Sequence, residues 1–208
     1  MSIDTSTIIL IGVFLLVAFP VHEFSHALVA YRLGDGTAKL FGRLTLNPIT
    51  HFDPLGGLFL VITALLPGGL LFGWAKPTPV NPSNLRDRRN GEVLVALAGP
   101  ASNLVMASLG AMVFRLLGLG PEDFAELPAQ ILGNFVLFNI GLAVFNMLPI
   151  PPLDGSNLLF RLLSPQQAWQ WRPVLQQYGF IILIVFIFAL SRPLAALITD
   201  ATFFLLGL

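Results

Sequence analysis

Residues 8–26 read IILIGVFLLVAFPVHEFSH, an apolar run that ends in the pattern His22-Glu23-x-x-His26. Residues four apart on an α-helix project from one face, so the two imidazoles can bind one metal ion. The glutamate between them is placed to act as general base on a water held there. Ionisable groups inside a membrane helix are costly and mark functional sites. We therefore predict a metal centre buried below a lipid surface.

The composition is that of a polytopic membrane protein, with 208 residues, 55% of them hydrophobic and 11% charged. A formal net charge of +0 offers nucleic acid no electrostatic attraction, so no nucleic-acid partner is expected. The absence of cysteine excludes disulfides, Cys-rich zinc sites and thiol catalysis. The N-terminus lacks the basic region and cleavage site of a signal peptide. We expect a retained first helix and a single membrane-embedded domain over residues 1–208.

Four apolar stretches are long enough to cross a bilayer as helices, and they predict an all-α polytopic membrane fold. They cover about residues 5–33, 92–119, 129–150 and 174–191. The C-terminal helices are expected to extend over 174–207. The part that follows Ser191-Arg192-Pro193 fits either an interfacial helix or half of a helical hairpin.

A further apolar stretch, about residues 55–75, is interrupted by proline and glycine, and its unbroken part is too short to cross. Basic residues precede it (Lys39, Arg43) and follow it (Arg86 onward). If the stretch enters the membrane and returns, both basic groups face the cytoplasm, as the positive-inside rule prefers. We therefore predict a re-entrant segment at 55–75 in a multi-pass protein of the cell membrane. The N-terminus is then outside, and the active site lies toward the cytoplasmic half of the bilayer.

Two shorter segments do not have a helical pattern. Residues 37–47 alternate roughly between apolar and polar side chains, which predicts a short membrane-associated β-hairpin. Residues 75–82 carry closely spaced prolines, which disfavour helix and favour extended backbone. Irregular backbone is tolerated at membrane depth only where it is buried in protein or lines a cavity, and a hydrolytic site needs such a cavity.

A catalytic zinc ion takes three protein ligands and keeps one position open for water, so a third ligand is expected outside the first helix. Asp154 is the favoured candidate, because the prolines before it unwind the end of the third span and direct its carboxylate into the bundle. The count of crossings also places it at the depth of His22 and His26. An Asp-Gly turn is the plain structural alternative for Asp154. His51 stays open as an alternative ligand or as a residue that lines the site.

Three blocks of the sequence resemble the site-2 protease family of zinc intramembrane metalloproteases, peptidase family M50. They are His22-Glu23-x-x-His26, Ala98-Gly99-Pro100-x-x-Asn103 and Asn146-x-x-Pro149-x-Pro151-x-x-Asp154-Gly155. They occur in the family's order, and the resemblance spans about residues 8–160. It implies that His22, His26 and Asp154 bind one Zn²⁺ per chain and that Glu23 is the catalytic base. It also implies that the hairpin pairs with substrate, and that the chain is similar to compact prokaryotic members without PDZ or CBS domains.

The function expected is zinc-dependent endopeptidase cleavage in or near the transmembrane segments of membrane proteins, as in regulated intramembrane proteolysis. The partners are then the lipid bilayer and a transmembrane protein or peptide, whose helix must unwind before a carbonyl can react. Asn103 can donate a hydrogen bond to the oxyanion or the substrate backbone, or it can join two helices.

Two other functions fit the sequence less well. A membrane metal-ion transporter needs further ligands on a partner helix, and the chain has no second helix that bears histidine. A non-catalytic pseudoprotease would not need the base Glu23, which is present.

Overall fold

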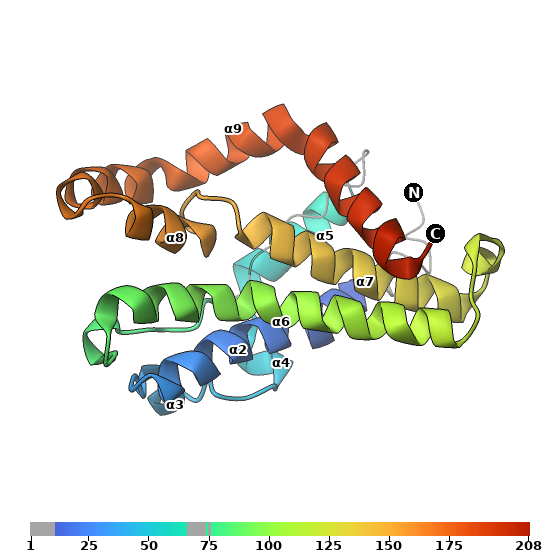
Figure 1. Ribbon diagram of the computed structural model, residues 1–208, viewed down its shortest axis with the longest axis horizontal. Helices are drawn as coiled ribbons and strands as arrows, with labels where there is room; N and C mark the ends of the chain where they lie inside the picture. The colour runs from blue at the N-terminus through green and yellow to red at the C-terminus, as the bar shows by residue number, and fades with distance from the viewer. Residues whose placement is uncertain (1–10, 66–73, 75) are drawn as a thin grey trace.

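The computed structural model describes residues 11–65, 74 and 76–208, and every regular element in them is helical. Four helical stretches are long and apolar enough to cross a membrane: Ile11–Arg32, Arg88–Leu116, Leu127–Asn146 and Pro165–Leu206. Figure 1 shows α6 and α7 side by side along the long axis, with α2 on one side and α9 on the other. The predicted all-α fold with four spans is confirmed, while residues 5–10 of the first span lie outside the described residues.

The first span combines a π-helical turn, η1 (Phe14–Ala18), with α2 (Phe19–Arg32). Pro20 directly follows the π-helical turn and has no N–H to donate back into it, so the helix lacks one backbone hydrogen bond at this point. One face of α2 is buried and carries both small residues and the two histidines. π-Turns inside helices are frequent at functional sites, and this one directly precedes the His22-Glu23-x-x-His26 turn.

The contact between α6 (Arg88–Leu116) and α7 (Leu127–Asn146) depends on small residues. A Cβ added to Gly110 would lie 2.7 Å from Cδ1 of Phe135, so glycine allows the two backbones to approach closely. A hydrophobic cluster joins these helices to the end of α9. Its buried members are Ala107, Ala111, Phe114, Ala129, Val136, Ile140 and Leu206.

The C-terminal helix α9 (Pro165–Leu206) is a single helix of 42 residues that contains Pro173 and Pro193. Proline inside a helix removes a hydrogen bond and bends the axis, and Figure 1 shows α9 bending over α7 before it returns toward the end of α6. The predicted alternatives for the tail after residue 191 were an interfacial helix and half of a helical hairpin, and the structure joins this tail to the helix before it. The helix continues through Pro193, and its last turn packs Leu206 into the core of the bundle.

The predicted β-hairpin at residues 37–47 was also wrong. Thr37–Leu40 forms the short helix α3, turns follow it, and Pro48–His51 forms α4. The backbone groups are satisfied locally, as in the bonds from Phe41 N–H to Thr37 O (3.1 Å) and from Arg43 N–H to Ala38 O (2.8 Å). Asp35 Oδ1 accepts the Thr37 N–H at 3.0 Å and so supports the start of α3. Because these N–H groups bond within the segment, they are not available to pair with a neighbouring strand.

The connection from α2 to α6 contains α5 (Pro54–Leu65), whose 12 residues are too few to span a bilayer core. The second half of the predicted re-entrant segment, residues 66–73 and 75, lies outside the described residues. After a short 3-10 turn, η2 (Pro82–Asn84), the Arg86 N–H donates to Leu33 O at 3.0 Å. The connection therefore starts and finishes at the same end of the bundle.

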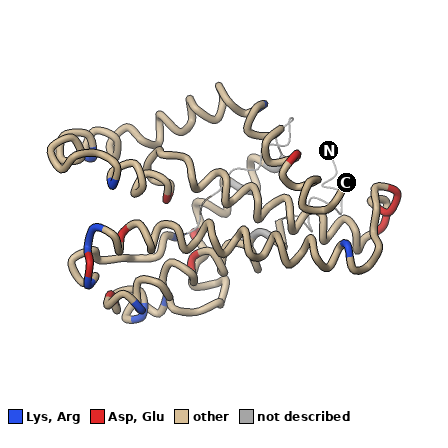
Figure 2. The backbone as a smooth tube through the Cα atoms, in the orientation of Figure 1, with Lys and Arg blue, Asp and Glu red and all other residues tan. Residues whose placement is uncertain are grey.

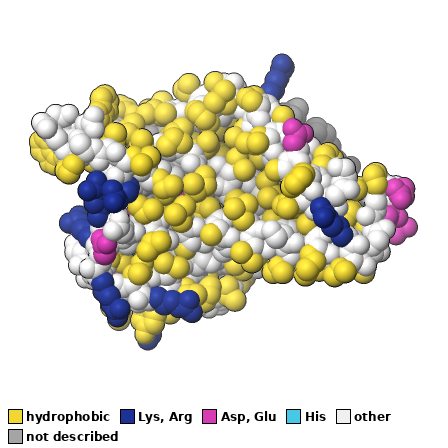
Figure 3. All heavy atoms as spheres, viewed as in Figure 1, with side chains coloured by type: hydrophobic (Ala, Val, Ile, Leu, Met, Phe, Trp, Pro, Cys, Tyr) yellow, Lys and Arg dark blue, Asp and Glu magenta, His cyan; other side chains and the backbone are white. Residues whose placement is uncertain are grey.

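Charge separates the two ends of the molecule. In Figure 2 most lysines and arginines gather at the end where α2 meets the start of α6, and the acidic turn η3 (Pro121–Ala125) forms the opposite end. On the face shown in Figure 3, hydrophobic side chains are spread over the surface between these two ends. This distribution is the one expected of a bundle that crosses a membrane along its long axis.

Candidate active site

His22 and His26 lie one turn apart on the buried face of α2, with their Nε2 atoms 3.0 Å from each other. His22 Nδ1 lies 2.6 Å from Asn103 Oδ1, and His26 Nδ1 lies 2.7 Å from the Val95 carbonyl oxygen. Both partners only accept, so each ring donates from Nδ1 and keeps a lone pair on Nε2. The two imidazoles thus turn their free nitrogens toward one point.

Asp154 reaches the same point from the turn between α7 and α8 (Gly155–Leu162). Its Oδ2 lies 3.3 Å from His22 Nε2 and 3.2 Å from His26 Nε2. The prolines at 149, 151 and 152 prevent α7 from continuing, which sets this turn. A Cβ on Gly155 would lie 2.3 Å from Met147 O, so the turn also requires glycine.

The donor set fits a zinc ion. In a tetrahedral site with bonds of about 2.0 Å, neighbouring ligand atoms are about 3.3 Å apart. The observed separations are 3.0–3.3 Å, and the three ligand atoms all lie within 4.8 Å of one another. Asp154 Oδ2 is buried and has no well-formed hydrogen bond to a described residue, which is costly unless a cation satisfies it.

Asn103, from the middle of α6, is completely buried. While its Oδ1 bonds His22, its Nδ2 donates to Asn139 Oδ1 on α7 at 2.9 Å, and Asn139 Nδ2 donates to Phe135 O at 2.8 Å. Both ends of the Asn103 amide are therefore used within the bundle, which favours the alternative that joins helices over an oxyanion donor. Sequence reasoning missed Asn139, whose only signal was an amide side chain inside an apolar span.

Gly99 lies directly beside the two imidazoles. A Cβ at this position would come 2.4 Å from His26 Nε2 and 2.7 Å from His22 Nε2. The absence of a side chain at Gly99 therefore keeps open the space between the two imidazoles and Asp154.

Glu23 is buried beside the histidines and lines the cavity described below. Its Oε2 accepts the Thr78 backbone N–H at 2.8 Å, and its main-chain oxygen accepts the Thr78 hydroxyl at 3.1 Å. Thr78 belongs to residues 76–81, a segment without helix or strand that we call the proline strap. Sequence reasoning predicted the extended backbone from the prolines but not its contact with Glu23.

His51 lies apart from this cluster. It is 2% exposed on α4, its Nε2 donates to Thr45 O at 2.8 Å, and its main-chain oxygen accepts the Lys76 N–H at 2.9 Å. Among the described residues, the group of potential ligands that converges on one point contains His22, His26 and Asp154 without His51. The contacts of His51 are those of a residue that holds the start of the proline strap.

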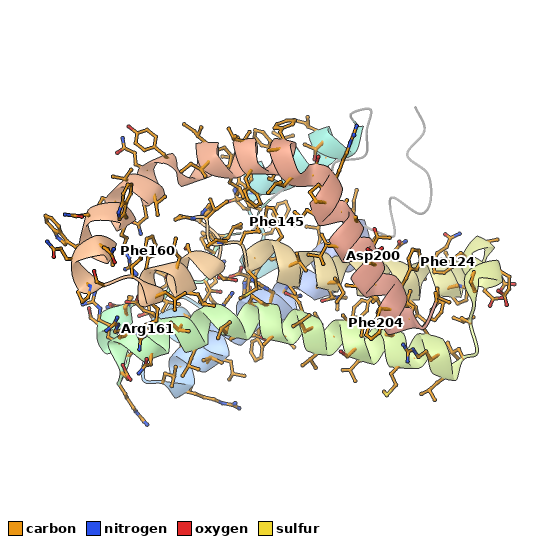
Figure 4. The ribbon with its side chains drawn as sticks, turned by 45° about the horizontal axis from the view of Figure 1, so that its top comes forward. Phe124, Phe145, Phe160, Arg161, Asp200 and Phe204 are labelled. Atoms are coloured by element: carbon orange, nitrogen blue, oxygen red, sulfur yellow. The ribbon has the colours of Figure 1, made fainter. Side chains whose placement is uncertain are left out.

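A cavity of about 1060 Å³ opens beside Glu23, His22, His26 and Asp154. Its wall is mainly apolar, and Figure 4 shows Phe145 in the space between α7 and α9. At its polar end, the Arg172 guanidinium lies 3.1 Å from the Glu92 carboxylate and joins α9 to α6. Further lining residues include Phe19, Pro77, Phe138, Phe180, Leu183 and Ile187.

Comparisons with known proteins agree with this geometry. Residues 122–190 match the model of peptidase family M50. Over 175 residues the chain is 40% identical to "Putative zinc metalloprotease YwhC" of Bacillus subtilis, which covers 82% of this chain and 76% of that protein. The chain belongs to peptidase family M50.

Other M50 relatives come from mycobacteria. "Putative zinc metalloprotease Rip2" of Mycolicibacterium smegmatis is 34% identical over 201 residues, or 88% of this chain and 71% of the relative. The Mycobacterium tuberculosis (H37Rv) protein of the same name is 36% identical over 102 residues, or 49% of this chain and 38% of the relative. No solved structure matches the chain.

The M50 assignment and the four apolar helices together identify a zinc metalloprotease of the site-2 type that acts within the membrane. The prediction from sequence is confirmed at this level, and a transporter or pseudoprotease is not favoured.

Gly99→Ala in this M50 protease is expected to weaken zinc binding at least about tenfold and to lower cleavage in parallel. The added methyl group must displace one of the two imidazoles, His22 or His26, whose Nε2 atoms converge with Asp154 on one point. Zinc affinity is measured by competition with a chelator. Gly36→Ala is the control, because Gly36 has open space around its Cβ position and no positive φ. A Gly99→Ala protein with the zinc affinity of the native chain would contradict this account.

Proposed function

We propose that His22, His26 and Asp154 hold the zinc ion of this intramembrane protease and that Glu23 is its general base. The observation that carries the proposal is the convergence of two Nε2 atoms and one buried carboxylate oxygen within 4.8 Å, with Glu23 on the same helix beside a cavity. Two neutral imidazoles and one carboxylate form a donor set typical of catalytic zinc, which leaves a position for water.

Zinc, when bound, polarises the peptide carbonyl and lowers the pKa of water. Glu23 accepts the proton from the attacking water and passes it to the leaving amine. Asn103 and the Val95 carbonyl fix the tautomer and orientation of the two imidazoles through their Nδ1 atoms, as second partners of metal-bound histidines generally do. In this proposal Asn103 is a positioning residue. Its hydrogen bond to Asn139 on α7 holds the Asn103 side chain in the orientation that contacts His22.

The substrate is a transmembrane segment of another protein. An apolar cavity between membrane helices accepts lipid-facing side chains without the cost of removing them from lipid into water. The cut must occur where the substrate helix is unwound, because a helical carbonyl is already hydrogen-bonded and is shielded from attack.

The site lies toward the cytoplasmic half of a cell membrane, and the short helix α5 enters the bilayer without crossing it. Support comes from the bond between Arg86 N–H and Leu33 O and from the basic residues gathered at that end of the bundle. α5 is too short to cross by itself.

Sidedness can be tested by labelling. A cysteine in place of Arg88, which is exposed at the start of α6, is expected to react with an impermeant maleimide only from the cytoplasmic face. A cysteine in place of Glu122, in the opposite loop, is the matched control and is expected to react only from outside. The native chain has no cysteine, so the background is clean. Labelling of residue 88 from outside would reverse the proposed orientation.

The activity itself is tested with purified protein in lipid vesicles. Removal of zinc by a chelator is expected to reduce cleavage of a transmembrane peptide at least about 100-fold, and added zinc is expected to restore it. Comparison of membrane-protein fragments in cells with the native chain and with Glu23→Gln then identifies the substrate. Cleavage that persists in metal-free protein would overturn the proposed mechanism.

A further inference from the structure

The proline strap makes a direct hydrogen bond to the proposed base, and this contact belongs to none of the motifs recognised in the sequence. Thr78 donates its backbone N–H to Glu23 Oε2 at 2.8 Å and its hydroxyl to Glu23 O at 3.1 Å. These two bonds hold one residue of the strap to both the side chain and the main chain of one residue of α2.

The sequence around Thr78 prepares this donor. Pro77 and Pro79 flank it, and a residue before proline is restricted to extended backbone. Neither proline has an N–H, so Thr78 supplies the only backbone donor over these three positions. The direction of its N–H is therefore fixed by the covalent structure of the strap as well as by its contacts.

Both ends of the strap are anchored away from Glu23. At one end the Lys76 N–H donates to His51 O at 2.9 Å, and at the other the Asn81 N–H donates to Asp35 Oδ2 at 2.7 Å. Asp35 is completely buried. Burial raises the pKa of its carboxyl, but hydrogen bonds from Thr37, Asn84 and Asn81 outweigh this effect and hold the pKa below its usual value. The anchor is thus an ionised carboxylate.

The bond to Thr78 distinguishes the two carboxylate oxygens of Glu23. Oε2 is held by the strap, whereas Oε1 has no hydrogen bond to a described residue, although the side chain lines the cavity. Oε1 is therefore the oxygen available to a water molecule. A carboxylate with three side-chain torsions would otherwise sample several rotamers, and only some of them direct an oxygen at the water.

We propose that the backbone N–H of Thr78 is a positioning group for catalysis, which holds Glu23 in the rotamer that presents Oε1 to the attacking water. This inference rests on the proposed role of Glu23 as the base. The hydrogen bond is charge-assisted and remains possible when Glu23 carries the proton, since its partner is then a neutral carboxyl oxygen. The hydrogen bond from Thr78 therefore orients the Glu23 side chain both when Glu23 accepts the proton from water and when it passes that proton to the leaving amine.

The test replaces one backbone amide with an ester in the full-length protein. Incorporation of the α-hydroxy analogue of valine at position 78 removes the N–H, and Thr78→Val is the reference with the same side chain. The matched control is the same ester at position 80. Val80 also follows a proline, but its N–H donates to no described residue. We measure kcat and KM with a transmembrane peptide in vesicles, zinc per chain and the melting temperature.

The ester at position 78 is expected to lower kcat about 10- to 100-fold relative to Thr78→Val, with KM and zinc content unchanged. The ester at position 80 is expected to leave kcat within about twofold. A displaced strap would instead raise KM or lower the melting temperature in both ester variants, and that result would overturn the proposal. Equal kcat for the ester at 78 and Thr78→Val would do the same. The role of Glu23 is judged separately, because Glu23→Gln stays inactive whether or not Thr78 positions it.

Discussion

Glu23→Gln is expected to lower the rate of peptide cleavage by about 10²–10⁴-fold while the protein still binds one zinc ion. The amide has nearly the same shape as the carboxylate, and its oxygen can still accept the Thr78 N–H. It cannot accept a proton from water at neutral pH. Because His22, His26 and Asp154 are unchanged, the metal centre remains. The measurements are kcat in vesicles and zinc per chain by elemental analysis.

The control for this variant is Glu122→Gln, which makes the same chemical change in the exposed loop at the opposite end of the bundle. Its rate and zinc content are expected to equal those of the native chain. Full activity of Glu23→Gln would refute the role of Glu23 as base. Loss of zinc from Glu23→Gln would instead make Glu23 part of the metal centre.

Asp154→Ala is expected to weaken zinc binding by at least about 100-fold, because it removes one of the three proposed protein ligands and the only negative charge among them. Loss of cleavage follows from loss of the metal. Zinc affinity is measured by chelator competition on purified protein. The melting temperatures of the native chain and the variant, both without metal, show whether the variant still folds. They are expected to be similar, because the Asp154 side chain makes no capping hydrogen bond to α8.

His51→Ala is the matched comparison for Asp154→Ala, because His51 was the other candidate ligand. It is expected to keep zinc at the native level, since its Nε2 bonds Thr45 O and its ring lies outside the converging cluster. Should Asp154→Ala keep its zinc while His51→Ala loses it, the assignment of the third ligand would be reversed.

Hydropathy and local spacing correctly predicted the spans and the histidine pair. The pair on α2 needs only the 3.6-residue period of a helix, which is a property of neighbouring residues. The break before Asp154 likewise follows from local chemistry, because prolines cannot continue a helix. The prediction of a hairpin at 37–47 was wrong because of another local interaction. Asp35 accepts the Thr37 N–H and so favours a helical turn there, and this bond outweighs the rough alternation of apolar and polar residues.

The longer-range features could not be read from the sequence. Whether Asn103 faces substrate or His22 depends on how α6 is rotated and shifted against α2 and α7. The close contacts at Gly99 and Gly110 determine this arrangement. The path of α9 after residue 191 was open for the same reason, since it depends on the packing of Leu206 in one cluster with Phe114 and Ala129.

The sequence alone determined that this protein crosses the membrane as helices and carries two imidazoles and a carboxylate on one turn, because hydrophobicity and helical period act over a few residues. The tertiary structure decided that Asp154 rather than His51 meets these imidazoles and that Thr78 meets Glu23. Both contacts join residues more than fifty positions apart, and such contacts depend on how whole helices pack, which no short sequence pattern encodes.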